Sequence, residues 1–216
     1  MQATKDRLLA AAGDLFAERG FHGTTVRDIA ARAGVNVAAG NYHYGSKRSL
    51  YLEVLRAQFA AIRTELRVRG ASQPAAQLDR MSRRELIALL RARVNVMLDL
   101  LIGPPPGVAG TLMLREMCDP SEALPTIVAE FIEPMMGEMR EIAAHLEPGL
   151  DRGAVERCVF SITGQALFYR FTMPATLRML GVPAYPRGFA GRLARHITEF
   201  SLGGMQRAAG GRRHAR

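Results

Sequence analysis

Apolar residues recur at helical spacing along most of the chain, and this pattern predicts an all-α protein. The first helix begins near Thr4 and ends at Gly20. One of its faces is apolar: Leu8, Ala12, Leu15 and Phe16. The hydroxyls of Thr24 and Thr25 open a second, short helix, which Gly34 ends. Its apolar face is Val26, Ile29, Ala30 and Ala33.

A third short helix is expected from Asn36, whose side chain caps it, to Tyr42. Two short helices joined by a turn that contains Gly form the helix-turn-helix pattern. The second helix of such a pair fits the major groove of DNA. We therefore expect residues 1–47 to form a three-helix DNA-binding domain.

The remaining patterns predict a larger helical region. Ser46 caps a linking helix over residues 47–69, which runs from the DNA-binding domain into the rest of the chain. Ser82 and Glu85 form a capping box at the start of the next long helix, which reaches about Ile102. That helix is apolar on much of its circumference, which is typical of a central, buried helix.

Proline residues divide the next part of the chain. The run Gly103–Gly107 contains three prolines and predicts a hard break between helices. A short helix around residues 112–117 comes next, and then a long helix from about Glu122 to Leu146. Pro134 lies inside the long helix and predicts a kink near Ile132–Pro134.

Two final amphipathic helices are expected over residues 151–173 and 186–206. Their apolar faces are Val155, Val159, Ile162 and Ala166 in the first and Phe189, Leu193, Ile197 and Phe200 in the second. In a bundle that is already complete, these faces lack an internal partner. They therefore indicate a four-helix interface with a second copy of the chain.

Composition narrows the possible partners. The formal charge of +9 and pI near 10.5 favour a polyanionic partner, although charge alone is a weak indication. Cys118 and Cys158 lie far apart and are expected to be small buried hydrophobic residues, with no disulfide or metal site. No apolar run reaches the ~18 residues of a membrane span, so we expect a cytoplasmic protein without membrane contact.

Several short motifs occur together in the first quarter of the chain. The run Phe16–Ala30, then Ala33-Gly34-Val35 and Tyr42–Lys47, resembles the N-terminal domain of the TetR/AcrR family of bacterial transcriptional regulators. Ser161–Arg170, with Met173-Pro174-Ala175, is similar to the C-terminal domain of the CecR-like branch. The resemblance implies a homodimeric repressor that binds a palindromic DNA operator and is released by a small-molecule inducer.

The resemblance and the helical patterns together divide the chain. Residues 1–47 form the DNA-binding domain, which continues into the linking helix 47–69. Residues 70–208 form a helical ligand-binding and dimerisation domain, and residues 209–216 a flexible basic tail. For that tail, both DNA contact and plain disorder stay open.

Candidate DNA contacts fall into two groups. Amide and small apolar side chains suit base edges: Asn36, Val37, Ala38 and Asn41. Hydroxyl, cationic and aromatic groups suit phosphates: Thr24, Thr25, Arg27, Tyr42, His43 and Lys47. Tyr44 is expected to be a core aromatic residue. Two positions depart from the family pattern, Gly40 in place of a branched apolar anchor and Asn41 in place of a frequent tyrosine.

Seven polar residues are candidates for the ligand pocket because small-molecule sites combine apolar walls with a few polar groups. They are Asn95, Asp99, Arg115, Glu116, Gln165, Tyr169 and Arg170. Each has an alternative: Arg115 and Glu116 as surface charges, Asn95 and Asp99 as bonds between helices, and Tyr169 as dimer packing.

The sequence does not favour an enzyme. It lacks a GxSxG elbow, a phosphate-binding glycine loop and an HExxH motif, and its five histidines are scattered. We therefore expect no catalytic residue, metal or cofactor. The alternative is a DNA-binding protein without an inducer, nonspecific or architectural, although the large apolar C-terminal region favours the ligand-responsive regulator.

Overall fold

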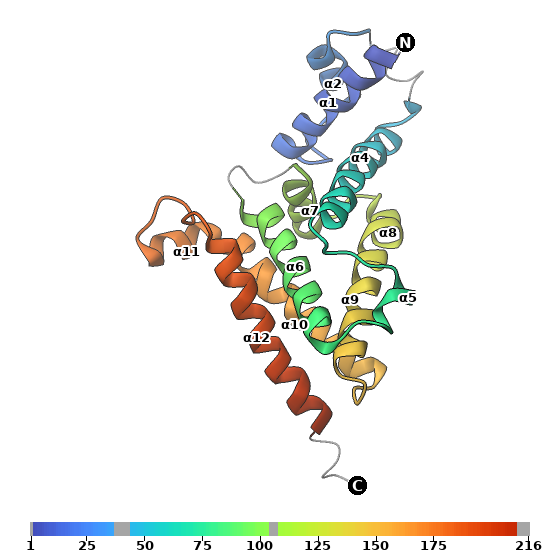
Figure 1. Ribbon diagram of the computed structural model, residues 1–216. Coiled ribbons are helices and arrows are strands. Elements are labelled where there is room, and N and C mark those ends of the chain that lie inside the picture. Colours follow the sequence, from blue (N-terminus) through green and yellow to red (C-terminus); the bar gives the residue numbers. More distant parts are fainter. Residues whose placement is uncertain (1, 37–43, 104–107, 211–216) are drawn as a thin grey trace. The chain divides into compact units, whose positions relative to one another are not determined.

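The computed structural model describes residues 2–36, 44–103 and 108–210, and every regular element in these ranges is a helix (Figure 1). The all-α prediction is confirmed. The chain forms two compact units, which interleave along the sequence. Unit 1 comprises Met1–Ile62 and Gly107–Ile132, and unit 2 comprises Arg63–Pro106 and Glu133–Arg216. The domain division expected from the sequence follows chain order, whereas residues 107–132 pack with the N-terminal part.

Unit 1 contains α1 (Gln2–Arg19), α2 (Val26–Ala33), the first part of α4 (Lys47–Val68), α7 (Val108–Cys118), α8 (Leu124–Ile127) and the π-helical turn η1 (Val128–Ile132). The first two helices end as their sequences predict, because Gly20 and Gly34 adopt positive φ angles of 75° and 64°. The core of unit 1 joins three elements through Phe16, Ile29 and Tyr51, each at most 1% exposed.

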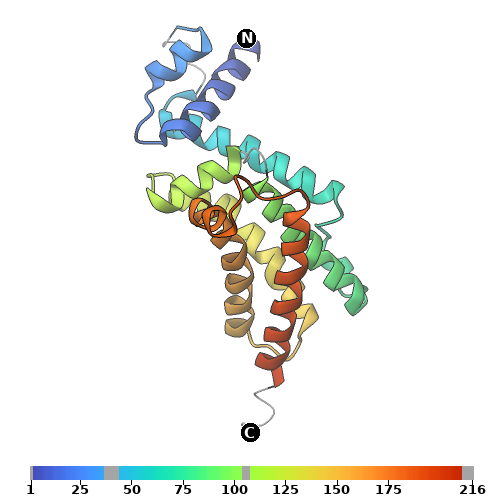
Figure 2. The ribbon, with the colours of Figure 1, turned by 90° about the vertical axis from the view of Figure 1, so that its left-hand side faces the viewer.

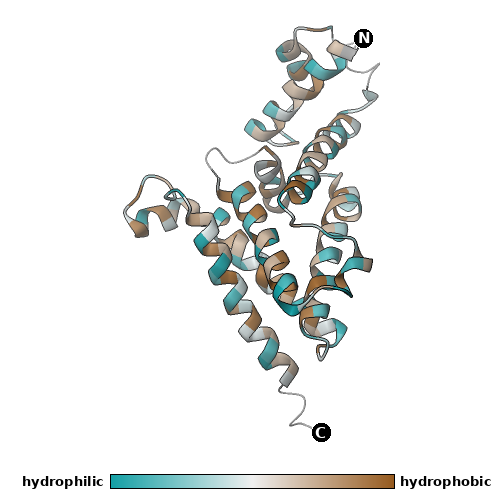
Figure 3. Ribbon diagram, in the orientation of Figure 1, coloured by the Kyte–Doolittle hydropathy of each residue, from teal (hydrophilic) through white to brown (hydrophobic). Residues whose placement is uncertain are grey.

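Unit 2 contains α5 (Ala75–Leu78), α6 (Arg83–Ile102), α9 (Glu133–Leu146), α10 (Arg152–Phe171), α11 (Met173–Leu180), α12 (Phe189–Gly210) and the end of α4. Helix α6 packs against α9, α10 and α12 (Figures 1 and 2), and hydrophobic residues recur along its length (Figure 3). The predicted capping box is present, since the Ser82 hydroxyl accepts from the Glu85 amide and the Glu85 carboxylate accepts from the Ser82 amide. Helix α6 is thus the central, buried helix that its composition predicts.

Two long helices expected from the sequence are each divided. The stretch from Glu122 to Leu146 forms α8, η1 and α9, and the π-helical turn ends two residues before Pro134. Proline lacks the amide hydrogen that would bond to the carbonyl of Glu130, so the irregularity lies where the proline predicts it. The helix expected over residues 151–173 is α10, which ends at Phe171. It is followed by α11, a helix that the sequence pattern did not predict.

The expected dimer residues on α10 and α12 need correction. Six of the eight are buried inside unit 2 at 6% exposure or less: Val155, Val159, Ile162, Ala166, Leu193 and Ile197. They cover α6, which is apolar around most of its circumference and therefore needs both helices as partners. Phe189 is half-buried, and its ring stacks on that of Tyr185. Only Phe200, at 67% exposure, points outward.

A different set of apolar side chains on α10 and α12 remains exposed. We call it the outer aromatic face: Phe160, Phe168, Phe171 and Phe200, which are between 43% and 67% exposed. Apart from Phe200, these exposed residues are not those that were expected to pair with a second copy of the chain.

Two smaller expectations also change. Cys118 is exposed and Cys158 is partly buried, so Cys118 is not the buried hydrophobic residue that its apolar neighbours suggested. Helix α12 continues to Gly210, beyond the expected start of the tail at residue 209. Among the described residues, no group of three His, Cys, Asp or Glu side chains could hold a metal ion, and no helix is long and apolar enough to span a bilayer.

Candidate DNA interface and ligand pocket

The N-terminal end of α2 is ordered by its cap. The Thr25 hydroxyl accepts a hydrogen bond from the Asp28 amide at 3.1 Å, and the Asp28 carboxylate accepts from the Thr25 amide at 3.1 Å. Hydrogen bonds from Thr25 hold the pKa of Asp28 below its usual range. Thr25 is exposed and stands at the N-terminus of a helix, which is the kind of position that binds phosphate.

Thr24 has a different role from the one the sequence suggested. Its side chain is 1% exposed, and its hydroxyl lies 2.8 Å from the carbonyl oxygen of Gly20 and 3.2 Å from that of Leu15. A buried hydroxyl that donates to the end of α1 cannot also reach a phosphate. Thr24 instead attaches the start of α2 to α1, and we remove it from the DNA contacts.

The other described candidates lie on both sides of the turn. Arg27, in the first turn of α2, and Asn36, two residues after Gly34, are exposed. The remaining expected contacts, Val37, Ala38, Asn41, Tyr42 and His43, fall outside the described residues, as does Gly40. Their roles stay predictions from the sequence.

Lys47 and Tyr44 connect the start of α4 to the turn that follows α1 and to α1 itself. The Lys47 ammonium donates to the Phe21 carbonyl at 3.0 Å and lies 4.2 Å from the centre of the Phe21 ring. Tyr44 is 8% exposed and donates to the Lys5 carbonyl at 3.2 Å, as expected of a core aromatic residue. The cation of Lys47 is therefore held in place beside Phe21.

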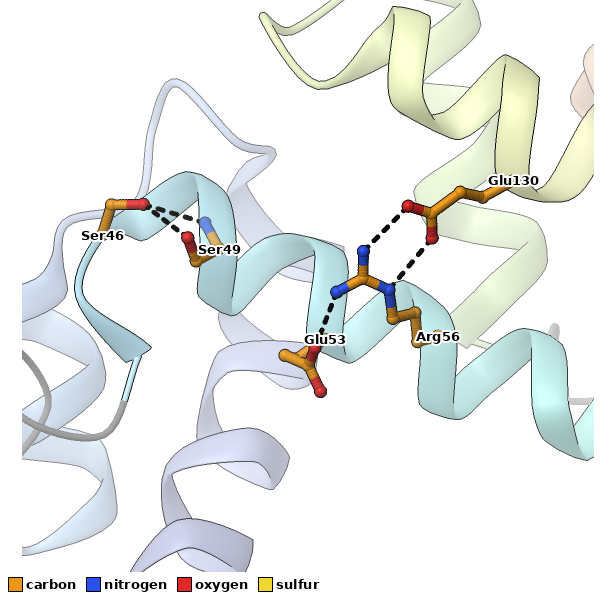
Figure 4. Close-up of polar contacts among 5 residues, drawn as sticks. All are labelled: Ser46, Ser49, Glu53, Arg56 and Glu130. Atoms are coloured by element: carbon orange, nitrogen blue, oxygen red, sulfur yellow. Dashed lines mark hydrogen bonds and ion pairs between the residues drawn. The ribbon is translucent and has the colours of Figure 1, made fainter.

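Ser46 caps the start of helix α4, and further along the helix Arg56 bonds to two acidic side chains (Figure 4). The Ser46 hydroxyl accepts from the Ser49 amide at 3.0 Å, which confirms the expected cap. Further along the helix, the Arg56 guanidinium donates two hydrogen bonds to the Glu130 carboxylate, at 2.8 and 3.0 Å, and a third to Glu53 at 2.7 Å. The bonds from Arg56 hold the pKa of Glu130 below its usual range.

Two of the expected pocket residues, Arg115 and Glu116, have partners within unit 1. The Arg115 guanidinium donates to the carbonyl oxygens of Ala17, at 2.8 Å, and Glu18, at 2.6 Å. The Glu116 carboxylate is 2% exposed and accepts from the Tyr51 hydroxyl. Both residues therefore have structural roles within unit 1, whereas the other five candidates belong to unit 2.

Asn95 and Asp99 form a polar pair on α6, as their spacing allows. The Asn95 amide donates to the Asp99 carboxylate at 3.3 Å, and that carboxylate also pairs with Arg69 at 2.7 Å. Asp99 therefore bonds outside its own helix, to the residue that follows α4, which is close to the alternative of a bond between helices. The Asn95 carbonyl oxygen is buried and has no hydrogen-bond partner among the described atoms.

A shallow hollow of about 370 Å³ lies on the surface of α10 and α12. It is lined by Gly164, Gln165, Phe168, Tyr169, His196 and Ile197. It brings together two of the expected pocket residues, Gln165 and Tyr169, and its lining does not include Arg170. The Gln165 amide is already bonded to the Ser161 carbonyl and the Ser201 hydroxyl, both at 3.2 Å.

Comparison with known proteins identifies relatives of the chain. Residues 8–54 match the family model of bacterial regulatory proteins of the tetR family, and residues 83–205 match that of the C-terminal domain of the HTH-type transcriptional dual regulator CecR. The chain is 35% identical over 150 residues to CecR of Shigella flexneri, a match covering 66% of this chain and 64% of that protein. The RutR regulator of Escherichia coli strain K12 is 45% identical over 56 residues, which is 26% of each chain.

Solved structures extend the comparison over nearly the whole chain. HlyIIR, a hemolysin II transcriptional regulator, has a TM-score of 0.63 and 24% identity, and the match covers 91% of this chain and 98% of that one. A HlyIIR mutant with residues 169–186 replaced by a linker has a TM-score of 0.62 at 25% identity, over 89% and 96% of the two chains. These similarities show that the fold is shared.

Proposed function

Because the chain belongs to the TetR family of bacterial transcriptional regulators, with a C-terminal region of the CecR type, we propose that it is a homodimeric repressor. In this proposal it binds a palindromic operator and leaves it when a small-molecule inducer binds. One observation carries the proposal: Thr24 attaches α2 to α1, and Thr25 orders its start. Arg27, in the first turn of α2, and Asn36, the first residue of the expected recognition helix, are both exposed.

A second copy of the chain is the partner that best fits the outer aromatic face. Its four phenylalanine side chains lie on two helices that pack together, and a monomer would leave them in water. A twofold axis through such a face buries the same patch on both copies. The two DNA-binding parts would then read two half-sites about one helical turn, ~34 to 36 Å, or a small multiple of it, apart.

The net charge of the chain does not measure the attraction of its DNA-binding part for DNA. Basic and acidic side chains are equal in number in unit 1, so the whole formal charge of +9 belongs to unit 2. The net charge of the chain is therefore no measure of how strongly unit 1 attracts DNA. We expect operator binding to lose affinity with salt according to the number of phosphate contacts from residues such as Arg27.

The hollow on α10 and α12 is our candidate inducer site. Its volume of about 370 Å³ suits a small ligand, and its walls combine the rings of Phe168 and Tyr169 with the polar groups of Gln165 and His196. Phe168 also belongs to the outer aromatic face. An inducer in the hollow would therefore alter how two copies pack, and it would favour the dimer geometry that it binds more tightly.

In vitro selection from random duplex DNA tests the proposal. We expect the selected sites to converge on an inverted repeat that binds two protomers, measured by light scattering of the complex. Selected pools without a shared motif, bound no more tightly than random DNA, would favour the nonspecific or architectural alternative. A thermal-shift screen of small molecules, repeated with Tyr169→Ala, then tests the inducer site.

A further inference from the structure

Residues 107–132 belong to the C-terminal region by sequence and to the N-terminal unit by structure. They lie within the stretch 83–205 that matches the CecR C-terminal model, and from Val108 on they pack in unit 1, where α7 contacts α1 and several side chains contact α4. Two consecutive residues of α7, Arg115 and Glu116, make polar contacts from this segment to those two helices. Their contacts explain why the segment belongs to unit 1.

Arg115 holds the C-terminal end of α1. The last carbonyl groups of a helix lack partners within the helix, and a cation there also interacts favourably with the helix dipole. The Arg115 guanidinium supplies both the missing hydrogen bonds and the positive charge, since it donates to the carbonyls of Ala17 and Glu18. Beyond them the chain turns at Gly20 and reaches Thr24, whose hydroxyl donates back to the Gly20 carbonyl. Arg115 thus supports the turn from which α2 starts.

Glu116 holds α4 from the next position on α7. Its carboxylate accepts from the Tyr51 hydroxyl at 3.0 Å and from the amide and hydroxyl of Ser121, both at 2.9 Å. Tyr51 is 1% exposed, and its ring packs edge-on against that of Phe16 on α1. The carboxylate is therefore fixed by three donors, one of which belongs to α4.

Further contacts fasten the rest of the segment to α4. The Arg48 guanidinium donates to the Thr126 hydroxyl at 2.8 Å, and Arg56 bonds to Glu130 (Figure 4). The rings of Phe59 and Phe131 stack with their centres 4.4 Å apart. The segment 107–132 is thus attached to α4 at several points and to α1 through Arg115.

We propose that Arg115 and Glu116 are positioning residues for operator recognition. Neighbouring residues of one helix hold the end of α1 and the first half of α4, so they fix the geometry of the helices that precede and succeed the helix-turn-helix segment in the chain. This inference rests on the proposed function, because it assumes a specific operator. It assigns the segment 107–132 to DNA reading, although the family model places it in the C-terminal domain.

The test compares Arg115→Met with Arg84→Met, which removes the same charge from an exposed site on α6. Both variants and the wild type are titrated against a duplex with the selected inverted repeat and against a scrambled duplex, at two salt concentrations. We expect Arg115→Met to lower the ratio of operator to scrambled affinity about tenfold, as loss of bonds from a charged group allows. The salt dependence and the scrambled-DNA affinity should stay unchanged, because Arg115 bonds to α1 and not to phosphate.

The ratio of the two affinities separates a positioning effect from a loss of folded protein. An inactive fraction lowers the apparent affinities for operator and scrambled DNA equally and leaves their ratio unchanged. An unchanged ratio in Arg115→Met, with a wild type that prefers its operator, overturns the inference alone. A wild type without any preference refutes the proposed function, and with it the role of Arg115 at an operator.

Hydrogen exchange of the DNA-free proteins gives a second, independent result. Arg115→Met should exchange faster than wild type and Arg84→Met at the amides of residues 18–24, where the end of α1 loses its support. Equal exchange in all three proteins would show that Arg115 does not hold this turn and would overturn the inference whatever the DNA result.

Discussion

The buried hydrogen bond between Tyr51 and Glu116 allows a quantitative prediction. Tyr51→Phe removes only the hydroxyl, which donates to the Glu116 carboxylate at 3.0 Å, and both side chains are at most 2% exposed. A hydrogen bond to a buried charge contributes about 1.5 to 3 kcal/mol. The other carboxylate oxygen keeps its two donors from Ser121, so we expect a loss of about 2 kcal/mol.

Urea denaturation followed by circular dichroism measures this loss. With a slope of about 1.5 kcal/mol per molar urea, the midpoint should fall by about 1.3 M. Tyr44→Phe is the matched control in the same unit, because its hydroxyl donates to the neutral carbonyl of Lys5. The control should lose about 1 kcal/mol or less. Equal losses in the two variants would refute the claim that the Glu116 charge gives the Tyr51 bond its strength.

The same bond predicts a pH dependence. Burial does most to raise the pKa of Tyr51 far above its usual value. The negative charge of Glu116 and the hydrogen bond to Glu116 raise this pKa further. The folded protein therefore keeps a proton that the unfolded chain releases above pH ~10. Stability from this group is complete below pH ~10 and falls at higher pH, and Tyr51→Phe should fall less steeply than wild type. Parallel curves would contradict the assignment.

Four further predictions concern other parts of the chain. Thr25→Ala removes the cap of α2 and should destabilise unit 1 by about 1 kcal/mol in urea denaturation. The pKa of His145 is raised first by its hydrogen bond to the Glu141 carbonyl and then by Asp79. The stability that this shift contributes is present below pH ~6.5 and is lost as pH rises through the raised pKa. Asp79→Asn should therefore destabilise the protein at pH 6 and have little effect at pH 9. Phe200→Ser should shift the proposed dimer towards monomer in sedimentation experiments while leaving the circular dichroism spectrum unchanged. Arg27→Ala should weaken binding to all DNA sequences and lower the slope of log affinity against log salt by about 1, whereas a changed base preference would remove it from the phosphate contacts.

The sequence predicts local features of this fold well. The capping residues Thr25, Ser46 and Ser82 all act as expected, because a cap depends on residues three positions apart. The irregularity before Pro134 is local for the same reason. The centrality of α6 also follows from its own residues, since a helix that is apolar around its circumference needs neighbours on every side.

Long-range pairing is where sequence reasoning fails. Arg115 and its partner carbonyl at Ala17 are separated by 98 positions, and nothing in the pattern around either residue indicates the other. Six of the eight expected dimer residues are instead buried inside unit 2, for a related reason. An apolar stripe such as Val155, Val159 and Ile162 shows that a face is buried, and only the packing of α10 on α6 shows that its partner is internal.

One titration decides whether this protein is a sequence-specific regulator. Fluorescence polarisation of the protein is measured against DNA from its own upstream intergenic region and against a scrambled duplex of equal length, at two salt concentrations. We expect the affinity for the native fragment to be higher by a factor of ~10³ or more, with two protomers bound per site. Equal, salt-sensitive affinity for both duplexes would contradict a sequence-specific regulator, provided that every fragment recovered by selection gives the same result.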